Sequence, residues 1–333
     1  MRLRRSDCSG PGLTRHRRGK GFRFVDEHGE PIDDEETLER VRGLVIPPAW
    51  RDVWICPAPN GHIQATGLDE AGRKQYRYHD AWRVRRDAAK FDDMLAFARL
   101  LPALREEVAR ELARAKLDRD GVLAAAVRLL DRGFFRVGGE GYAGENGSFG
   151  LATIRREHVT QRGGTVVFDY PAKSGKRRMQ AVVDPEVAAV VRTLKRRRGG
   201  GEELLAYKER GRWRDVRSAD VNAWLKDRTG QDVSAKEFRT WGATVLAAVA
   251  LAVSGRASGT KTARKRAVTR AVKEVAGYLG NTPAVARSSY IDPRVIDRFT
   301  DGQAIDVATV GEDPGDLAVQ APLERAVLEL IED

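Results

Sequence analysis

Two patterns of apolar and polar residues divide the chain near residue 80. Residues 1–80 hold short alternating stretches separated by turns such as DEHGEP and PAPNGH, and one helical stretch at 33–44. Alternation with a period of two predicts β-strands. Beyond residue 80, apolar residues recur every three or four positions, first at Val84, Ala88 and Phe91, which predicts helices. We therefore expect an α+β protein with a small β-rich domain at 1–80 and a larger, mainly helical domain at 81–333.

The larger domain contains one predicted hairpin among its helices. The segment 120–138 is apolar nearly all round, which predicts a buried helix leading to Arg136. Residues 164–184 alternate about the sequence AKSGK, which predicts a β-hairpin with Lys173 at its tip. We expect one face of this hairpin to carry Val166, Phe168, Tyr170, Met179, Ala181 and Val183. Two more helices are predicted at 218–229 and 236–253, before a basic stretch at 255–280.

Charge is unevenly distributed along the chain. The net charge is +11, yet residues 301–333 contain nine acids and one base, so residues 1–300 carry +19. Such a basic body suits a polyanion, usually nucleic acid, although a solvated basic surface explains the charge as well. Leu323, Val327 and Leu330 have helical spacing within the acidic segment. We interpret that segment as a solvated helix or a domain brace rather than a DNA mimic.

Targeting signals and cofactor motifs are absent from the sequence pattern. No apolar run approaches the roughly 20 residues that span a bilayer, and the N-terminus lacks the apolar core of a signal peptide. Cys8 and Cys56 form neither a disulfide framework nor a CxxC pair. We therefore expect a cytoplasmic, nucleoid-associated protein with no membrane partner.

Three formal motifs lack the context that their chemistry requires. A GxGxxG at 139–144 follows a helical pattern rather than a strand, and KSGK lacks the first glycine of a P-loop. The five histidines are scattered without metal-ligand spacing. We therefore expect no bound nucleotide, no metal site and no cofactor.

Cationic residues at the ends of predicted elements precede an asparagine and a tyrosine near the end of the chain. The set is Arg136, Lys173, Lys236, Arg239, Asn281 and Tyr290. Taken singly, each has an ordinary structural explanation, such as a solvated side chain or a helix cap. Together they match the attack of a phenol on a phosphodiester. That reaction needs cations at the non-bridging oxygens and an acid for the departing oxygen.

The chain resembles the type IB DNA topoisomerases of the poxvirus-like bacterial branch. Five long blocks carry the resemblance, at residues 43–82, 134–159, 170–176, 236–243 and 279–293. The resemblance implies that Tyr290 is the nucleophile and that Arg136, Lys173, Arg239 and Asn281 complete the catalytic set. Lys236 falls where the family has a second lysine implicated in protonating the leaving group. DNA contacts are implied for Gln75, Tyr76, Tyr78 and Tyr142.

The resemblance also implies an activity and an architecture. A monomer with the catalytic fold of type IB topoisomerases and tyrosine recombinases is expected to form a C-shaped clamp around duplex DNA. It would relax supercoils through a 3′-phosphotyrosyl intermediate, strand rotation and religation, without ATP or an obligatory metal. Eukaryotic and poxvirus members have histidine at the position of Asn281, whereas bacterial relatives share the asparagine. Asparagine donates a neutral hydrogen bond and does not titrate, so we expect a donor at this position.

Two other functions remain in competition. Tyrosine recombinases share the chemistry but usually carry an HxxR motif, which KEFR at 236–239 lacks. Asn281 also lies 42 positions after Arg239, a longer path than recombinases usually have. A non-catalytic protein that clamps DNA would explain the charge, but it leaves the complete set of tyrosine and cations without a role.

Overall fold

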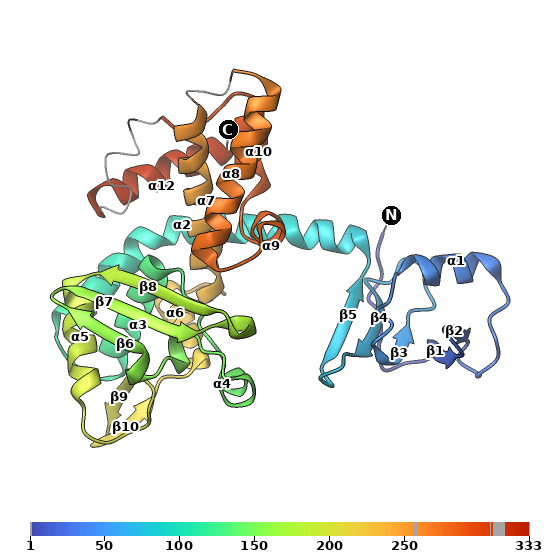
Figure 1. Cartoon of the computed structure of the whole chain (residues 1–333), viewed down its shortest axis with the longest axis horizontal. Helices are drawn as coiled ribbons and strands as arrows, with labels where there is room; N and C mark the ends of the chain where they lie inside the picture. Colours follow the sequence, from blue (N-terminus) through green and yellow to red (C-terminus); the bar gives the residue numbers. More distant parts are fainter. Residues whose placement is uncertain (1, 256–258, 307, 309–316, 333) are drawn as a thin grey trace. The chain divides into compact units, whose positions relative to one another are not determined.

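The structure, a computed structural model, describes residues 2–255, 259–306, 308 and 317–332 (Figure 1). The chain divides into an N-terminal unit, residues 1–90, and a C-terminal unit, residues 91–333. The division lies within helix α2 (Asp80–Ala113), ten residues after the boundary expected from the sequence.

The N-terminal unit is built on a five-stranded antiparallel sheet in the order β2-β1-β3-β4-β5. Its strands are β1 (Leu13–Arg18), β2 (Gly21–Val25), β3 (Arg51–Ile55), β4 (Ile63–Leu68) and β5 (Lys74–Tyr78). Helix α1 (Glu35–Gly43) begins at Asp34, whose carboxylate accepts a hydrogen bond from the Thr37 N–H at 2.8 Å. Val41 of α1 packs with Val53, Ile55 and Ala65 of the sheet. The β-rich domain and its single helix are thus confirmed.

The C-terminal unit is mainly helical and surrounds a buried central helix, α3 (Arg119–Gly133). Its other helices are α4 (Glu140–Asn146), α5 (Pro185–Arg196), α6 (Ser218–Thr229), α7 (Ala235–Gly255), α8 (Lys261–Leu279), α9 (Pro283–Ser289), α10 (Pro293–Thr300) and α12 (Leu317–Glu332), with short 3-10 turns η1 (Leu151–Thr153), η2 (Arg156–His158) and η3 (Lys173–Gly175). The strands are β6 (Val159–Arg162), β7 (Thr165–Pro171), β8 (Arg177–Val183), β9 (Ala206–Glu209) and β10 (Arg212–Asp215). Helix α3 contacts α5, α6, α7, β8 and β9. The near-continuous apolar sequence of α3 follows from this enclosure.

The hairpin expected at 164–184 is present, but the prediction for its second strand was wrong. Val166, Phe168 and Tyr170 of β7 are buried as expected, whereas Met179 and Val183 of β8 are among the most exposed large apolar residues. The register sets Val166, Phe168 and Tyr170 opposite Val182, Gln180 and Arg178. Met179, Ala181 and Val183 therefore occupy the outer face, and two long polar side chains turn inward beside Tyr170 and Phe168.

Helix α7 also corrects an expectation from the sequence. It is long and apolar enough to cross a membrane, with a mean hydropathy of 1.3 over its most apolar window, of which 61% is buried inside the protein. The helix contacts α3, α6, α8, α10 and α12. It also buries a charged side chain, Arg239, and the hydroxyls of Thr240 and Thr244. These contacts are those of a core helix.

Helix α12, in the acidic segment, is joined to the unit by a buried ion-pair cluster. Arg105 of α2 donates two hydrogen bonds to Asp131 at the end of α3, both at 2.8 Å. Two more reach Glu324 of α12, at 2.7 and 2.8 Å. Leu323, Val327 and Ile331 of α12 are buried on the same helix. Of the interpretations drawn from the sequence, this arrangement favours the brace.

Replacing Arg105 with methionine should lower the free energy of unfolding by about 3–5 kcal/mol, because two largely buried carboxylates lose their partner. Arg110→Met on the same helix removes an exposed pair with Glu107 and should cost less than about 1 kcal/mol. Urea denaturation of both variants measures the difference. Equal losses of stability would show that the buried cluster has no special role.

Candidate active site

A buried arginine joins the segments that carry the expected site. Arg239 of α7 is 3% exposed, and its Nη2 donates to the carbonyl of Leu279 at 3.0 Å. Its Nη1 donates to the carbonyl of Phe134, in the turn after α3. Phe134 has a left-handed backbone, with φ of 49°. A Cβ on Gly242 would lie 2.6 Å from the Phe134 ring, so this glycine allows the turn to pack against α7.

Arg136 and Asn281 meet beside this arginine. Arg136 follows the Phe134 turn, and its Nη2 donates to the Oδ1 of Asn281. Helix α8 ends at Gly280, which has φ of 62°, and the Asn281 N–H then donates to the carbonyl of Ala276 at 3.0 Å. This helix ending fixes the direction of the Asn281 side chain.

Tyr290 completes the cluster at the end of α9. The guanidinium carbon of Arg239 lies 5.3 Å from the centre of the Tyr290 ring. Burial raises the pKa of the Tyr290 phenol, but the positive charge of Arg239, with that of Arg136, outweighs it, so the pKa falls below its usual value. Burial, with the nearby charge of Arg136, lowers the pKa of Arg239 to about 10. Arg239 thus stays charged at neutral pH, and its charge makes the Tyr290 phenol more acidic than that of an ordinary tyrosine.

Two donors in the cluster lack hydrogen-bond partners within the described part of the chain. The Nε of Arg239 and the Nδ2 of Asn281 are both buried, and neither has an acceptor. A buried donor without a partner costs about 1–3 kcal/mol. Hydrogen-bond donors without partners beside a tyrosine can bind the oxygens of an anion that occupies the site during reaction.

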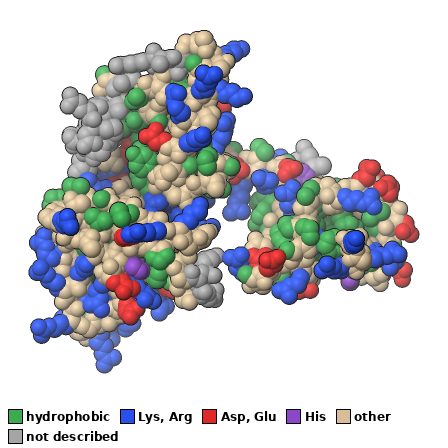
Figure 2. Space-filling view, in the orientation of Figure 1, with side chains coloured by type: hydrophobic (Ala, Val, Ile, Leu, Met, Phe, Trp, Pro, Cys, Tyr) green, Lys and Arg blue, Asp and Glu red, His purple; other side chains and the backbone are tan. Residues whose placement is uncertain are grey.

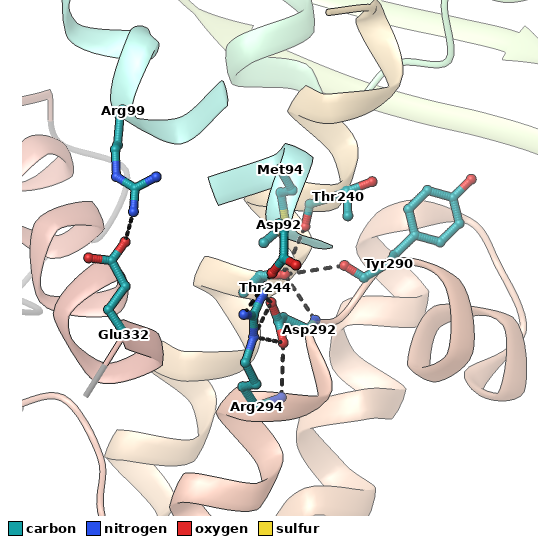
Figure 3. Close-up of polar contacts among 9 residues, drawn as sticks. All are labelled: Asp92, Met94, Arg99, Thr240, Thr244, Tyr290, Asp292, Arg294 and Glu332. Atoms are coloured by element: carbon teal, nitrogen blue, oxygen red, sulfur yellow. Dashed lines mark hydrogen bonds and ion pairs between the residues drawn. The ribbon is translucent and has the colours of Figure 1, made fainter. Parts of the chain in front are cut away.

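The backbone on either side of the tyrosine is held by a buried hydroxyl (Figure 3). The Oγ1 of Thr244 lies 3.3 Å from the Tyr290 carbonyl oxygen and accepts a hydrogen bond from the Asp292 N–H at 3.1 Å. The Nη2 of Arg294 donates to the Asp292 carboxylate at 2.8 Å. The Nη1 of Arg294 donates to the carboxylate of Asp92 in α2 at 3.0 Å. The Tyr290 ring extends away from this network.

The two expected lysines occupy different surroundings. Lys173 lies at the exposed tip between β7 and β8 and lines an open pocket of about 650 Å³ together with Arg136 and Arg178. Lys236 is exposed on α7, one turn before Arg239, and does not line that pocket. The structure therefore brings Arg136, Arg239, Asn281 and Tyr290 together, sets Lys173 beside Arg136 and leaves Lys236 outside the cluster.

Arg178 and Thr244 are parts of the site that the sequence reasoning missed. The Nη2 of Arg178 donates to the carbonyl of Tyr278 at 2.8 Å, and burial lowers the pKa of this arginine. A Cβ on Gly280 would lie 2.8 Å from its Nη1. The correct register of β8 would have identified Arg178 as an inward-facing residue. Thr244 gave no signal, since a threonine in an apolar helix is common.

The expected contacts of the N-terminal unit lie on β5. The rings of Tyr76 and Tyr78 stack with centres 6.0 Å apart, and Tyr76 is 45% exposed. Gln75 points to the other face, where its Nε2 donates to Asp69 at 2.9 Å. Tyr142 belongs to α4, but its side chain lies outside the described residues. Among the residues that the structure describes, no group of three or more His, Cys, Asp or Glu side chains could hold a metal.

Comparisons with known proteins agree with the chemistry of this cluster. The family profile described as eukaryotic DNA topoisomerase I, catalytic core, matches residues 79–304. The profile of the bacterial DNA topoisomerase IB N-terminal domain matches residues 21–69. DNA topoisomerase 1B of Acanthamoeba polyphaga mimivirus is 27% identical over 317 residues, covering 93% of this chain and 94% of the viral one. The first match alone spans more than half of the sequence, and the chain therefore belongs to the type IB DNA topoisomerase family.

Proposed function

We propose that Tyr290 cuts one strand of duplex DNA and that Arg136, Arg239 and Asn281 bind the scissile phosphate. The observation that carries this proposal is the tyrosine of lowered pKa beside two unpartnered buried donors. The phenolic oxygen loses its proton to solvent and bonds to phosphorus, and the bond from phosphorus to the 5′ oxygen breaks. A 3′-phosphotyrosyl link then preserves the phosphodiester energy for religation by the 5′ hydroxyl.

Lys173 is the proposed proton donor to the departing 5′ oxygen. Its exposed place at a hairpin tip, lining the same pocket as Arg136, supports this role because the tip can reach a bound duplex. Lys236 is proposed as a second lysine that assists. It is exposed and has no ion-pair partner in the described part of the chain, so it is available to DNA.

The substrate is proposed to be supercoiled duplex DNA, relaxed by a monomer without nucleotide or obligatory metal. We infer that the C-terminal unit has the catalytic fold shared with tyrosine recombinases and that both units contact the duplex as a C-shaped clamp. The stacked Tyr76 and Tyr78, with Gln75 and Tyr142, are proposed DNA contacts. A nucleoid location would follow from DNA binding.

Tyr290→Phe should abolish plasmid relaxation and the covalent adduct while leaving DNA affinity nearly unchanged, since only the attacking oxygen is lost. The assay is relaxation of a supercoiled plasmid in EDTA without ATP, with the adduct detected on denaturing gels. Relaxation by the variant near the wild-type rate would reject Tyr290 as nucleophile. Wild-type protein that exchanges strands between two marked duplexes would indicate a recombinase, and wild-type protein that forms no adduct would indicate a DNA-binding module.

Arg136→Ala, Arg239→Ala and Lys173→Ala should each slow single-turnover cleavage, the two arginine variants by at least roughly 100-fold. A 5′-bridging sulfur leaves as a thiolate and needs little protonation. It should therefore restore cleavage by Lys173→Ala far more than by the arginine variants. Equal restoration in all three variants would remove Lys173 from the role of general acid.

Thr244→Val should slow cleavage by about 10-fold, the scale of one lost buried hydrogen bond. Thr240→Val is the matched control, because its hydroxyl also lies buried on α7 but bonds only to the Lys236 carbonyl of its own helix, at 3.3 Å. Thr244→Ser should recover most of the rate. Single-turnover cleavage at saturating enzyme is the measurement, and a decrease in affinity for DNA without a decrease in this rate would contradict a positioning role.

A further inference from the structure

Two arginines from different elements bind the last carbonyl groups of helix α8. An α-helix leaves its last four carbonyls without donors inside the helix. In α8, two of these accept from the N–H groups that follow the helix. The Tyr278 carbonyl accepts instead from the Nη2 of Arg178 at 2.8 Å. The Leu279 carbonyl accepts from the Nη2 of Arg239 at 3.0 Å. Strand β8 and helix α7 thus both hold the helix end that leads to Asn281.

The same two arginines share a second acceptor, the carbonyl of Phe134. The Nη2 of Arg178 donates to this oxygen at 3.4 Å, and Arg239 donates to it as well. Phe134 lies in the left-handed turn after α3, two residues before Arg136. A single guanidinium on β8 therefore contacts both the turn that leads to Arg136 and the helix end that leads to Asn281.

The guanidinium of Arg178 is also fixed within its own strand. Its Nε and Nη2 donate to the Oε1 of Gln180, at 3.0 and 2.7 Å. The strand register sets Arg178 opposite the buried Tyr170, on the inner face of the hairpin. Gly280 permits the close approach of α8, because a Cβ there would lie 2.8 Å from the Nη1 of Arg178. Acceptors on three segments therefore hold this side chain in one orientation.

The hairpin tip that carries Lys173 is joined closely to Arg178. The Ala172 N–H donates to the Lys176 carbonyl at 2.8 Å, which closes the tip. The paired ladder of β7 and β8 starts directly after this bond and includes Arg178. A shift of Arg178 relative to α8 would consequently move Lys173 as well.

The charges around the tip make such a connection necessary. The open pocket beside Lys173 and Arg136 is also lined by Lys176 and Arg178, and Glu274 is the one acid among its described lining residues. Figure 2 shows Lys and Arg side chains gathered where the hairpin of Figure 1 ends. Like charges repel, so these cations tend to separate the tip from Arg136. Arg178 opposes the separation through neutral carbonyls, which leave the cations free to attract a phosphate.

We propose that Arg178 is a positioning residue that couples Lys173 to Arg136 and Asn281. It holds the hairpin against the turn after α3 and the end of α8, so the proposed proton donor and the proposed phosphate-binding groups keep a fixed spacing before DNA binds. All of these groups must reach oxygens of one phosphorus, and a misplacement of about 1 Å can cost about 100-fold in rate. This role rests on the proposed cleavage function, because it presupposes the functions of Lys173 and Asn281.

Arg178→Met should slow single-turnover cleavage at saturating enzyme by about 30-fold or more, with an affinity for DNA within about threefold of wild type. Arg178→Lys keeps the charge but has a single nitrogen for acceptors that lie apart, so it should recover only part of the rate. Arg177→Met is the matched control. It removes the same charge from the adjacent exposed residue, which bonds to Asp169 at 2.7 Å, and should cleave within about threefold of wild type. Equal losses of rate in the two methionine variants would overturn the proposal.

Double-mutant cycles test whether Arg178 acts through the other side chains. When Arg178→Met is combined with Asn281→Ala or with Lys173→Ala, the loss of rate should fall short of the product of the single losses by at least about fivefold. Combined with Lys236→Ala, which changes a lysine outside the cluster, the product should hold within about twofold. A full product in either of the first two cycles would overturn the coupling.

Hydrogen exchange of the free protein tests the same connection without cleavage. The Asn281 N–H is bonded at the end of α8, and the Ala172 N–H is bonded in the hairpin tip. Both should exchange at least about 10-fold faster in Arg178→Met and at an unchanged rate in Arg177→Met. Unchanged exchange in Arg178→Met would reject the positioning role and assign the arginine to direct DNA contact. A wild-type protein that forms no adduct would reject the cleavage function, and the exchange rates alone would then decide whether Arg178 couples the two segments.

Discussion

The geometry of the candidate active site depends on one charge that the protein holds away from water. Arg239 cannot be buried without acceptors, and the acceptors it uses are main-chain carbonyls at Phe134 and Leu279. Those carbonyls belong to the turn before Arg136 and the helix end before Asn281. The hydrogen bonds that the Arg239 guanidinium needs therefore also set the positions of Arg136 and Asn281. The left-handed turn at Phe134 and the absence of a side chain at Gly242 are the local conditions for this arrangement.

Arg105 and Arg239 show opposite uses of the same residue type. Arg105 has four hydrogen bonds to two carboxylates, which raise its pKa despite burial, and it connects helices. Arg239 has no carboxylate partner among the described ion pairs and retains an open donor. Its pKa is lowered instead, so its charge is poorly compensated. A poorly compensated cation is unfavourable for stability but strongly attracts an incoming phosphate.

The sequence predicted most of the helices and strands. It predicted the type of reaction better than it predicted which side chains contact one another. Periodicity was sufficient for the β-rich start, the buried helix at 120–138 and the hairpin with Lys173 at its tip, because burial on one face leaves a repeating pattern. It failed for β8, where Met179 and Val183 are apolar yet exposed, since strand register depends on a partner that the pattern does not contain. The short strands β9 and β10 were missed because two exposed arginines alternate there with few apolar residues. The proximity of Arg136, Arg239 and Tyr290 was expected only through a family resemblance. The numbers of residues that separate them along the chain do not indicate that they lie close together in space.

The order of these residues along the chain has a consequence for biosynthesis. The acceptors of Arg239 lie 105 residues before it and 40 residues after it, and Tyr290 follows later still. A nascent chain that has emerged only through α7 has the arginine without its second carbonyl, without Asn281 and without Tyr290. The cluster can therefore assemble only after residue 290 has left the ribosome. Incomplete translation products would carry much of the positive charge of the protein but none of its cutting activity.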